Sequence, residues 1–173
     1  VGGVSFNGTT QVQTITTGAG KDVVQSAFVT TASKGATIST GAGNDTITVA
    51  TTGAGLTSVD AGAGDDIINV TKTAGNKLSI LGGEGNDTVV LAGAALATTD
   101  MINGGAGTDI ISLAGSSTTR VDDDFIVLNS LVTGFETLKL STAEGLNLAS
   151  GLNVAKLATT YTTIDFTTSS FVD

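Results

Sequence analysis

Several residue types are absent from this chain or scarce in it. The 173 residues include no cysteine, proline, histidine or tryptophan, and aromatic residues make up only 4%. A chain without cysteine has no disulfide, and one that also lacks histidine has no ordinary zinc, copper or haem site. The lack of proline is compatible with continuous β ladders, which need every backbone N–H. No stretch approaches the roughly 18 apolar residues of a membrane helix, so we expect no membrane insertion.

Positive charge is also scarce. Seven lysine and arginine residues stand against 16 aspartate and glutamate residues, which gives a formal net charge of −9. Nucleic-acid binding needs a basic face, so this composition argues against a nucleic-acid partner. What the chain has in abundance is glycine, with 24 residues, and threonine. Together with scattered valine and isoleucine, these residues favour strands and turns over helices.

One short phrase occurs five times. Its pattern is glycine, any residue, glycine, any residue, aspartate, and then an apolar residue two positions later. With the residue before the first glycine included, the copies are TGAGKDVVQ from Thr17, TGAGNDTIT from Thr40, AGAGDDIIN from Ala61, GGEGNDTVV from Gly82 and GGAGTDIIS from Gly104. Their aspartates lie 21 to 23 residues apart. A near-constant step of this size is typical of a coiled repeat architecture, so we interpret residues 1–114 as one solenoid.

The residues around each phrase follow a strand pattern. Apolar residues stand seven positions before each aspartate and two positions after it, and mostly apolar residues stand four positions after it. This alternation is typical of half-buried strands. We therefore predict an all-β fold, a parallel β-helix or β-roll with about 21–23 residues per turn. The predicted inward-facing ladders are Ile15, Ile38, Val59, Ile80 and Ile102; Val24, Ile47, Ile68, Val89 and Ile111; and Ser26, Val49, Val70, Leu91 and Leu113.

The glycines and the aspartate of each phrase form a candidate metal site. Glycine permits a tight turn that directs backbone groups into a concave cradle, and aspartate adds an anionic oxygen. Such oxygen ligands favour calcium, and because one loop offers fewer than the about 6–8 oxygens that calcium prefers, each ion would lie between two stacked loops. The predicted metal-binding residues, stacked along one edge, are Asp22, Gly18 and Gly20; Asp45, Gly41 and Gly43; Asp66, Gly62 and Gly64; Asp87, Gly83 and Gly85; and Asp109, Gly105 and Gly107.

Five stacked loops enclose four gaps, so we expect roughly four calcium ions, with weaker sites at the ends of the array. Lys21 places a positive charge beside the first gap, where we expect the weakest binding. Without a cation, the stacked carboxylates would repel one another across a few ångströms. We therefore predict that the metal-free chain is loose and that calcium drives its folding.

The phrase resembles the RTX calcium-binding repeat, G-G-x-G-x-D-x-U-x, in which U is apolar. Gly82–Val90 and Gly104–Ser112 match this pattern in full, whereas Thr17, Thr40 and Ala61 replace its first glycine. RTX repeats often follow one another every nine residues, which places ion loops on both edges of the roll, but here one loop recurs per turn. The resemblance implies calcium binding, export of the unfolded chain by a type I secretion machinery, and an extracellular location.

The phrase is lost after residue 114. VTGFETLKL, from Val132 to Leu140, resembles a degenerate coil in which Phe135 and Leu138 replace ion binding with apolar packing. GFETLKL also resembles the segment that follows RTX arrays in bacterial surface-layer (S-layer) proteins. Because the end of a solenoid needs a cap over its exposed strands, we predict that residues 115–173 are degenerate β-coils that form a C-terminal cap or a link to a next module.

Other interpretations of the acidic and glycine-rich segments explain less. Dinucleotide and phosphate loops need a helix after the glycine turn, whereas a β pattern follows each phrase here. No pair of carboxylates is marked out by a cleft, so we expect no enzymatic activity. Asp122, Asp123 and Asp124 form either an extra calcium site or, as we favour, a solvated acidic turn.

Three functions fit these observations. The favoured one is a structural calcium-binding segment of a secreted bacterial S-layer protein at the cell surface, in which calcium drives folding and lattice assembly. Its partners would be further copies in the lattice, together with cell-surface polysaccharide through another region. The alternatives are a calcium-folding RTX module of a secreted enzyme or toxin, and the stalk of a calcium-dependent adhesin. A protease HExxH helix or a serine-nucleophile elbow elsewhere in the protein would favour the enzyme, and this sequence contains neither.

Overall fold

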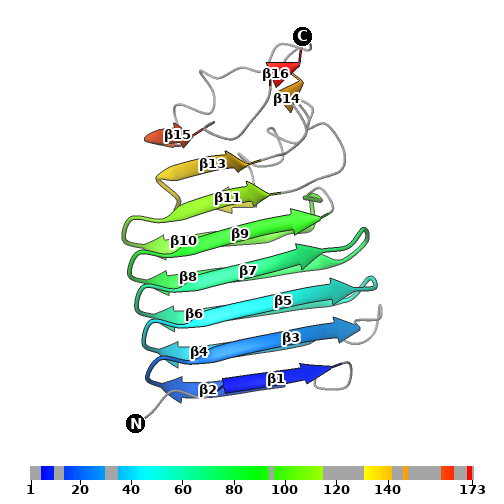
Figure 1. Ribbon diagram of the computed structural model, residues 1–173, viewed down its shortest axis with the longest axis vertical. Helices are drawn as coiled ribbons and strands as arrows, with labels where there is room; N and C mark the ends of the chain where they lie inside the picture. The colour runs from blue at the N-terminus through cyan, green and yellow to red at the C-terminus, as the bar shows by residue number, and fades with distance from the viewer. Residues whose placement is uncertain are drawn as a thin grey trace.

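The computed structural model describes residues 5–9, 14–29, 35–93, 96–114, 131–141, 146–147, 161–165 and 171–172. Their strands pair in parallel and coil into two main sheets, one behind the other (Figure 1). The first sheet contains, in spatial order, β1 (Ser5–Thr9), β3 (Val23–Val29), β5 (Thr46–Thr52), β7 (Ile67–Lys72), β9 (Thr88–Gly93), β11 (Ile110–Ala114), β13 (Thr137–Ser141) and β15 (Thr163–Asp165). The second contains β12 (Val132–Thr133), β10 (Met101–Ala106), β8 (Lys77–Glu84), β6 (Leu56–Ala63), β4 (Ala36–Ala42) and β2 (Thr14–Ala19). A separate pair consists of β14 (Leu146–Asn147) and β16 (Phe171–Val172).

Neighbouring strands are in register along the array. In the second sheet Ile38 pairs with Ile15 on one side and with Val59 on the other. In the first sheet Ile47 lies in the same way between Val24 and Ile68. Residues that share a place in the repeat therefore lie above one another, at the ~4.8 Å step of paired strands. The prediction of an all-β parallel solenoid is confirmed, with about five coils that carry the glycine phrase.

The core lies between the two sheets. Strand geometry turns every second residue inward, so in β5 Ile47, Val49 and Thr51 are buried while the residues between them are not. All fifteen residues of the three predicted inward ladders are buried, which confirms the strand pattern around each phrase. Burial of one Val, Leu or Ile side chain contributes about 1.5–3 kcal/mol, so these continuous ladders are a main source of the stability of the solenoid.

The coiling continues beyond the last glycine phrase. β12 pairs with β10, β13 with β11, and β15 with β13. Phe135, Leu138 and Tyr161 are buried, so the coil after the last phrase packs through apolar side chains, as predicted. These strands extend the same two sheets, and the domain boundary at residue 114 stays a prediction. Asp122–Asp124 lie outside the described residues.

The strands are connected at two different edges. At the edge on the left of Figure 1, the glycine phrases lead from each strand of the second sheet to the next strand of the first. At the opposite edge, turns such as residues 73–76 lead into the following coil. Within this turn, the Asn76 N–H donates to the Thr73 carbonyl. Within the described ranges, no helix is long and apolar enough to cross a membrane.

Candidate metal-binding edge

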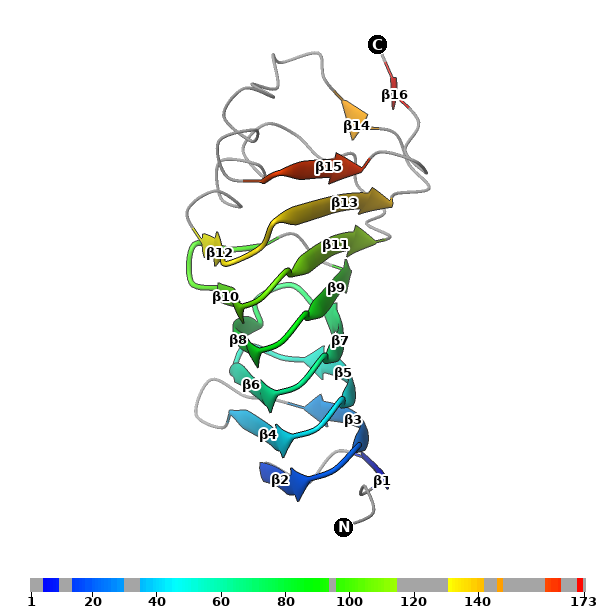
Figure 2. The same cartoon turned by 90° about the vertical axis from the view of Figure 1, so that its left-hand side faces the viewer.

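The five glycine phrases form a column along one edge of the solenoid, which faces the viewer in Figure 2. The parallel strand pairing continues into the phrases, so that Gly62 pairs in register with Gly41 on one side and with Gly83 on the other. Each aspartate directly precedes a strand of the first sheet, as Asp45 precedes β5. The fold therefore brings all fifteen predicted metal-binding residues to this edge.

The glycines are required by backbone angle and by space. Both glycines of a phrase have positive φ, from +98° at Gly41 to +143° at Gly107, and the one exception is Gly18 in the first phrase. In the second to fifth phrases, a Cβ at either glycine would collide with the carbonyl oxygen of the corresponding glycine one loop earlier. These carbonyl oxygens thus point along the column into the interface between loops, and only glycine lets successive loops approach so closely.

Each aspartate is hydrogen-bonded to its counterpart in the next loop. The backbone N–H of one aspartate donates to the Oδ1 of the following one, and all five residues are at most 1% exposed. We call this series the aspartate ladder. Its bonds are Asp22 to Asp45 (2.7 Å), Asp45 to Asp66 (2.7 Å), Asp66 to Asp87 (2.9 Å) and Asp87 to Asp109 (2.7 Å).

In four of the five residues of the aspartate ladder, the second carboxylate oxygen has no such bond. The Oδ2 atoms of Asp45, Asp66, Asp87 and Asp109 are buried without a hydrogen-bond partner. Burial raises the pKa of Asp66 and of Asp87 to about 6; the N–H donors of the ladder oppose this rise, and neighbouring carboxylates add to it. Burial also raises the pKa of Asp109. Because an unpaired anionic oxygen is strongly unfavourable in the interior, this edge favours a bound cation.

The donor set at this edge fits calcium. Among the described residues, no three histidine, cysteine, aspartate or glutamate side chains come together as a metal cluster. An ion here would combine carboxylate oxygens from the ladder with backbone carbonyls, which suits calcium because it accepts about 6–8 oxygens in flexible geometry. Gly104, the residue directly before the fifth phrase, keeps space open beside the carboxylate, since a Cβ there would lie 2.7 Å from the Oδ2 of Asp109.

A comparison with known protein families also indicates calcium binding. The RTX calcium-binding nonapeptide repeat, described in four copies, matches residues 35–49, 79–93 and 96–115, which include the second, fourth and fifth phrases. The segments that carry these three phrases are thus similar to RTX calcium-binding repeats. Because all five phrases share the pattern, we refer to them as the RTX loops. The match supports the prediction of calcium as the ion of these loops, while the number of ions and the individual ligands stay predictions. No curated protein and no solved structure matches the chain.

Two of the three RTX loops that lack the first glycine carry threonine in its place and gain a hydrogen bond there. The Thr17 hydroxyl donates to the carbonyl oxygen of Thr40, and the Thr40 hydroxyl donates to that of Ala61, both at 2.9 Å. These bonds tie the first loop to the second and the second to the third, at the position where the loops depart from the family pattern. The departure is therefore compatible with stacking, and each of these carbonyls keeps a second lone pair.

A second ladder runs along the exposed outside of the RTX loops. The Asp65 N–H donates to the Oδ1 of Asn44 (3.3 Å), the Asn86 N–H to that of Asp65 (2.8 Å), and the Thr108 N–H to that of Asn86 (2.9 Å). Here each side chain binds the following loop, whereas each carboxylate of the aspartate ladder binds the preceding one. This ladder was not predicted from the sequence, although asparagine or aspartate at the same place in three consecutive repeats was a visible signal.

The residue on which the aspartate ladder ends was not predicted from the sequence either. The Asp109 N–H donates to the Oε2 of Glu136 at 2.7 Å. Ile110 and Thr137 are paired in register, so Glu136 stands where a sixth aspartate would stand. The signal lay in TLKL, the strand that directly follows Glu136 as a strand follows each aspartate.

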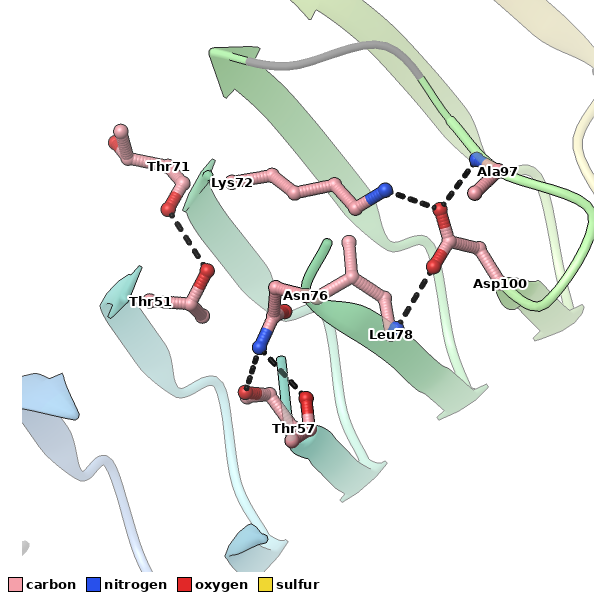
Figure 3. Close-up of polar contacts among 9 residues, drawn as sticks. Thr51, Thr57, Thr71, Lys72, Asn76, Leu78, Ala97 and Asp100 are labelled. Atoms are coloured by element: carbon pink, nitrogen blue, oxygen red, sulfur yellow. Dashed lines mark hydrogen bonds and ion pairs between the residues drawn. The ribbon is translucent and has the colours of Figure 1, made fainter. Parts of the chain in front are cut away.

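At the opposite edge, a buried ion pair connects two coils (Figure 3). The Lys72 Nζ lies 2.7 Å from the Oδ2 of Asp100, and the two side chains are 3% and 0% exposed. Asp100 also accepts the N–H groups of Leu78 (2.9 Å) and Ala97 (2.8 Å). These bonds hold the turn that precedes β10. Nothing in the repeat pattern indicates them, because Lys72 and Asp100 have no counterparts in the other coils and are 28 residues apart.

Proposed function

We propose that this chain is a calcium-folded, non-catalytic structural rod of a secreted protein at the bacterial cell surface. The observation that carries the proposal is the aspartate ladder, in which four consecutive buried carboxylates each keep one oxygen without a hydrogen-bond partner. The matches to the RTX calcium-binding repeat include three of the five loops. Roughly four calcium ions, one in each gap between loops, would neutralise these oxygens.

In this proposal calcium is a folding switch. Without the ion, carboxylates of successive coils repel one another and their buried oxygens lack partners. With the ion, the free energy of binding becomes free energy of folding. A chain exported by a type I machinery would stay unfolded in the calcium-poor cytosol and fold outside the cell, where calcium is plentiful.

Circular dichroism through a cycle of chelation and calcium addition tests the switch. We expect EGTA to abolish most of the β signal of the chain and excess calcium to restore it. Magnesium at the same free concentration should restore little, because it needs near-octahedral geometry and loses its waters reluctantly. Asp66→Asn should raise the calcium concentration at half-recovery, whereas Asp60→Asn, on the exposed face of β6, should leave it unchanged. A β signal that stays constant through the cycle would contradict the proposal.

Within this class, we propose an S-layer segment. GFETLKL and the acidic, threonine-rich, cysteine-free composition support it. The outer face of the second sheet also repeats small polar side chains in register, among them Thr14, Thr37, Ser58 and Ser79. Such a repeated surface suits lateral contacts between copies. Electron microscopy of the full protein should show ordered two-dimensional arrays with calcium and none with EGTA. A chain that folds in calcium but forms no arrays would favour an adhesin stalk or an enzyme module.

A further inference from the structure

The C-terminal end of the aspartate ladder needs a different acceptor. Each of the first four aspartate N–H groups donates to the aspartate of the following coil. The coil that follows Asp109 lacks the glycine phrase and its aspartate. Glu136 supplies the missing acceptor, because its Oε2 lies 2.7 Å from the Asp109 backbone N. The end of the ion array is thus closed by a carboxylate from a coil that lacks the glycine phrase.

A change in side-chain length accompanies a change in turn length. Val132 pairs with Ile102, yet Glu136 follows Val132 by four residues, whereas Asp109 follows Ile102 by seven. The shorter turn has no room for the two-glycine loop, and the extra methylene of glutamate extends the reach of the carboxylate. The same acceptor is thereby kept without the metal-binding loop that accompanies it elsewhere.

The coil of Glu136 packs tightly on the last RTX loop. Gly134 has φ of +67°, and a Cβ there would lie 2.6 Å from the Oδ1 of Asn103 and 2.9 Å from the backbone N of Gly105. The N–H groups of Glu136 and Thr137 both donate to the Asp109 carbonyl, at 3.1 Å. Glu136 is therefore held by its own backbone directly above Asp109.

We propose that Glu136 is the positioning residue that makes the fifth RTX loop competent to hold calcium. By accepting the Asp109 N–H, Glu136 fixes the backbone of Asp109. The buried Oδ2 of Asp109 has no hydrogen-bond partner. The role belongs to the acceptor oxygen that fixes Asp109. This inference rests on the proposed binding of calcium between RTX loops, and it assigns a defined end to that array.

Calcium counting on three forms of the chain tests the proposal. Glu136→Gln keeps an oxygen acceptor of the same reach, whereas Glu136→Met keeps the length and removes the acceptor. At the lowest calcium concentration that saturates the parent, equilibrium dialysis should find fewer ions on the Met variant, by up to one per chain, and the full number on the Gln variant. The half-saturation concentration for that last ion should rise about tenfold in the Met variant.

Glu84 provides the matched control. Its side chain is exposed on the fourth RTX loop, outside the aspartate ladder, so Glu84→Gln and Glu84→Met should bind the parental number of ions. Parental binding in Glu136→Met would overturn the inference. Equal loss in Glu136→Gln and Glu136→Met would also overturn it, because the charge and not the acceptor would then be required. The proposed function would fail separately, if the parent itself bound no calcium or if Asp66→Asn bound as many ions as the parent.

Discussion

Three glycines of this chain separate the effects of backbone angle and of space. At Gly62, φ is +105° and a Cβ would collide with the carbonyl oxygen of Gly41. At Gly75, in a turn of the opposite edge, φ is +84° but a Cβ would meet nothing within 4 Å. Gly18 has neither constraint. The three residues therefore form a graded test of how tightly the RTX loops stack.

We expect the cost of alanine to follow that order. In saturating calcium, Gly18→Ala should change the free energy of unfolding by less than about 0.5 kcal/mol, and Gly75→Ala should lower it by about 1 kcal/mol. Gly62→Ala should lower it by more than about 2 kcal/mol, because the strained angle and the blocked loop contact add together. Urea denaturation measures all three. Equal losses at Gly62 and Gly75 would show that contact between loops contributes nothing.

The buried ion pair of Lys72 and Asp100 makes a second prediction at the residue scale. Removal of one member of a buried pair leaves the other charge in the interior, and such changes typically lower stability by about 3–5 kcal/mol. Asp100→Ala should reach this range, because it also removes the acceptor of the Leu78 and Ala97 N–H groups. Lys72→Met should cost less, since Asp100 keeps those two donors. The comparison is made by urea denaturation in calcium, and a larger loss in Lys72→Met would contradict this account.

At the scale of the elements, the aspartate ladder predicts an unusual pH dependence for the metal-free chain. The pKa values of Asp66 and Asp87 are raised from 3.8 to about 6 in the folded state. The folded state therefore binds more protons than the unfolded state between these values, and its stability falls as pH rises. The stabilisation is complete below about pH 4 and is lost as pH rises through about 6, so acid should partly replace calcium.

This dependence is measured by circular dichroism of the metal-stripped chain from pH 4 to pH 7. The expected result is a β signal that falls as pH rises, with a flatter profile in the double variant Asp66→Asn, Asp87→Asn, which cannot titrate at these positions. With calcium present the trend should reverse, because the ion competes with protons for the same carboxylates. A metal-free β signal that rises from pH 4 to pH 7 would be incompatible with the buried ladder.

The repeated elements were predictable from the sequence because their physical causes are local and periodic. The inward residues follow from strand alternation, as at Ile47 and Val49, and the edge follows from the step between aspartates. The hydrogen bond from one aspartate to the next could not be predicted, because it depends on which carboxylate oxygen faces the neighbouring loop. Glu136 was missed because a shortened turn and a lengthened side chain compensate each other, which hides its place in the repeat.

At the scale of the whole molecule, the chain is a quasi-one-dimensional stack. Each coil contacts chiefly its two neighbours, so order passes along the axis through shared interfaces. An ion between two RTX loops would fix both of them, and each fixed loop would present a better site to the next gap. The sequence predicted this stack and its calcium edge, whereas Lys72 and Asp100 at the other edge could not be foreseen, because they belong to one coil interface and to no repeat.

The location of the ions in crystals grown with calcium tests the central claim most directly. Anomalous scattering should reveal a column of roughly four peaks along the edge of the glycine loops, each next to an Oδ2 of the aspartate ladder and in contact with backbone carbonyls of adjacent loops. A well-ordered solenoid with no peaks along this edge, or with peaks only elsewhere on the molecule, would contradict the account.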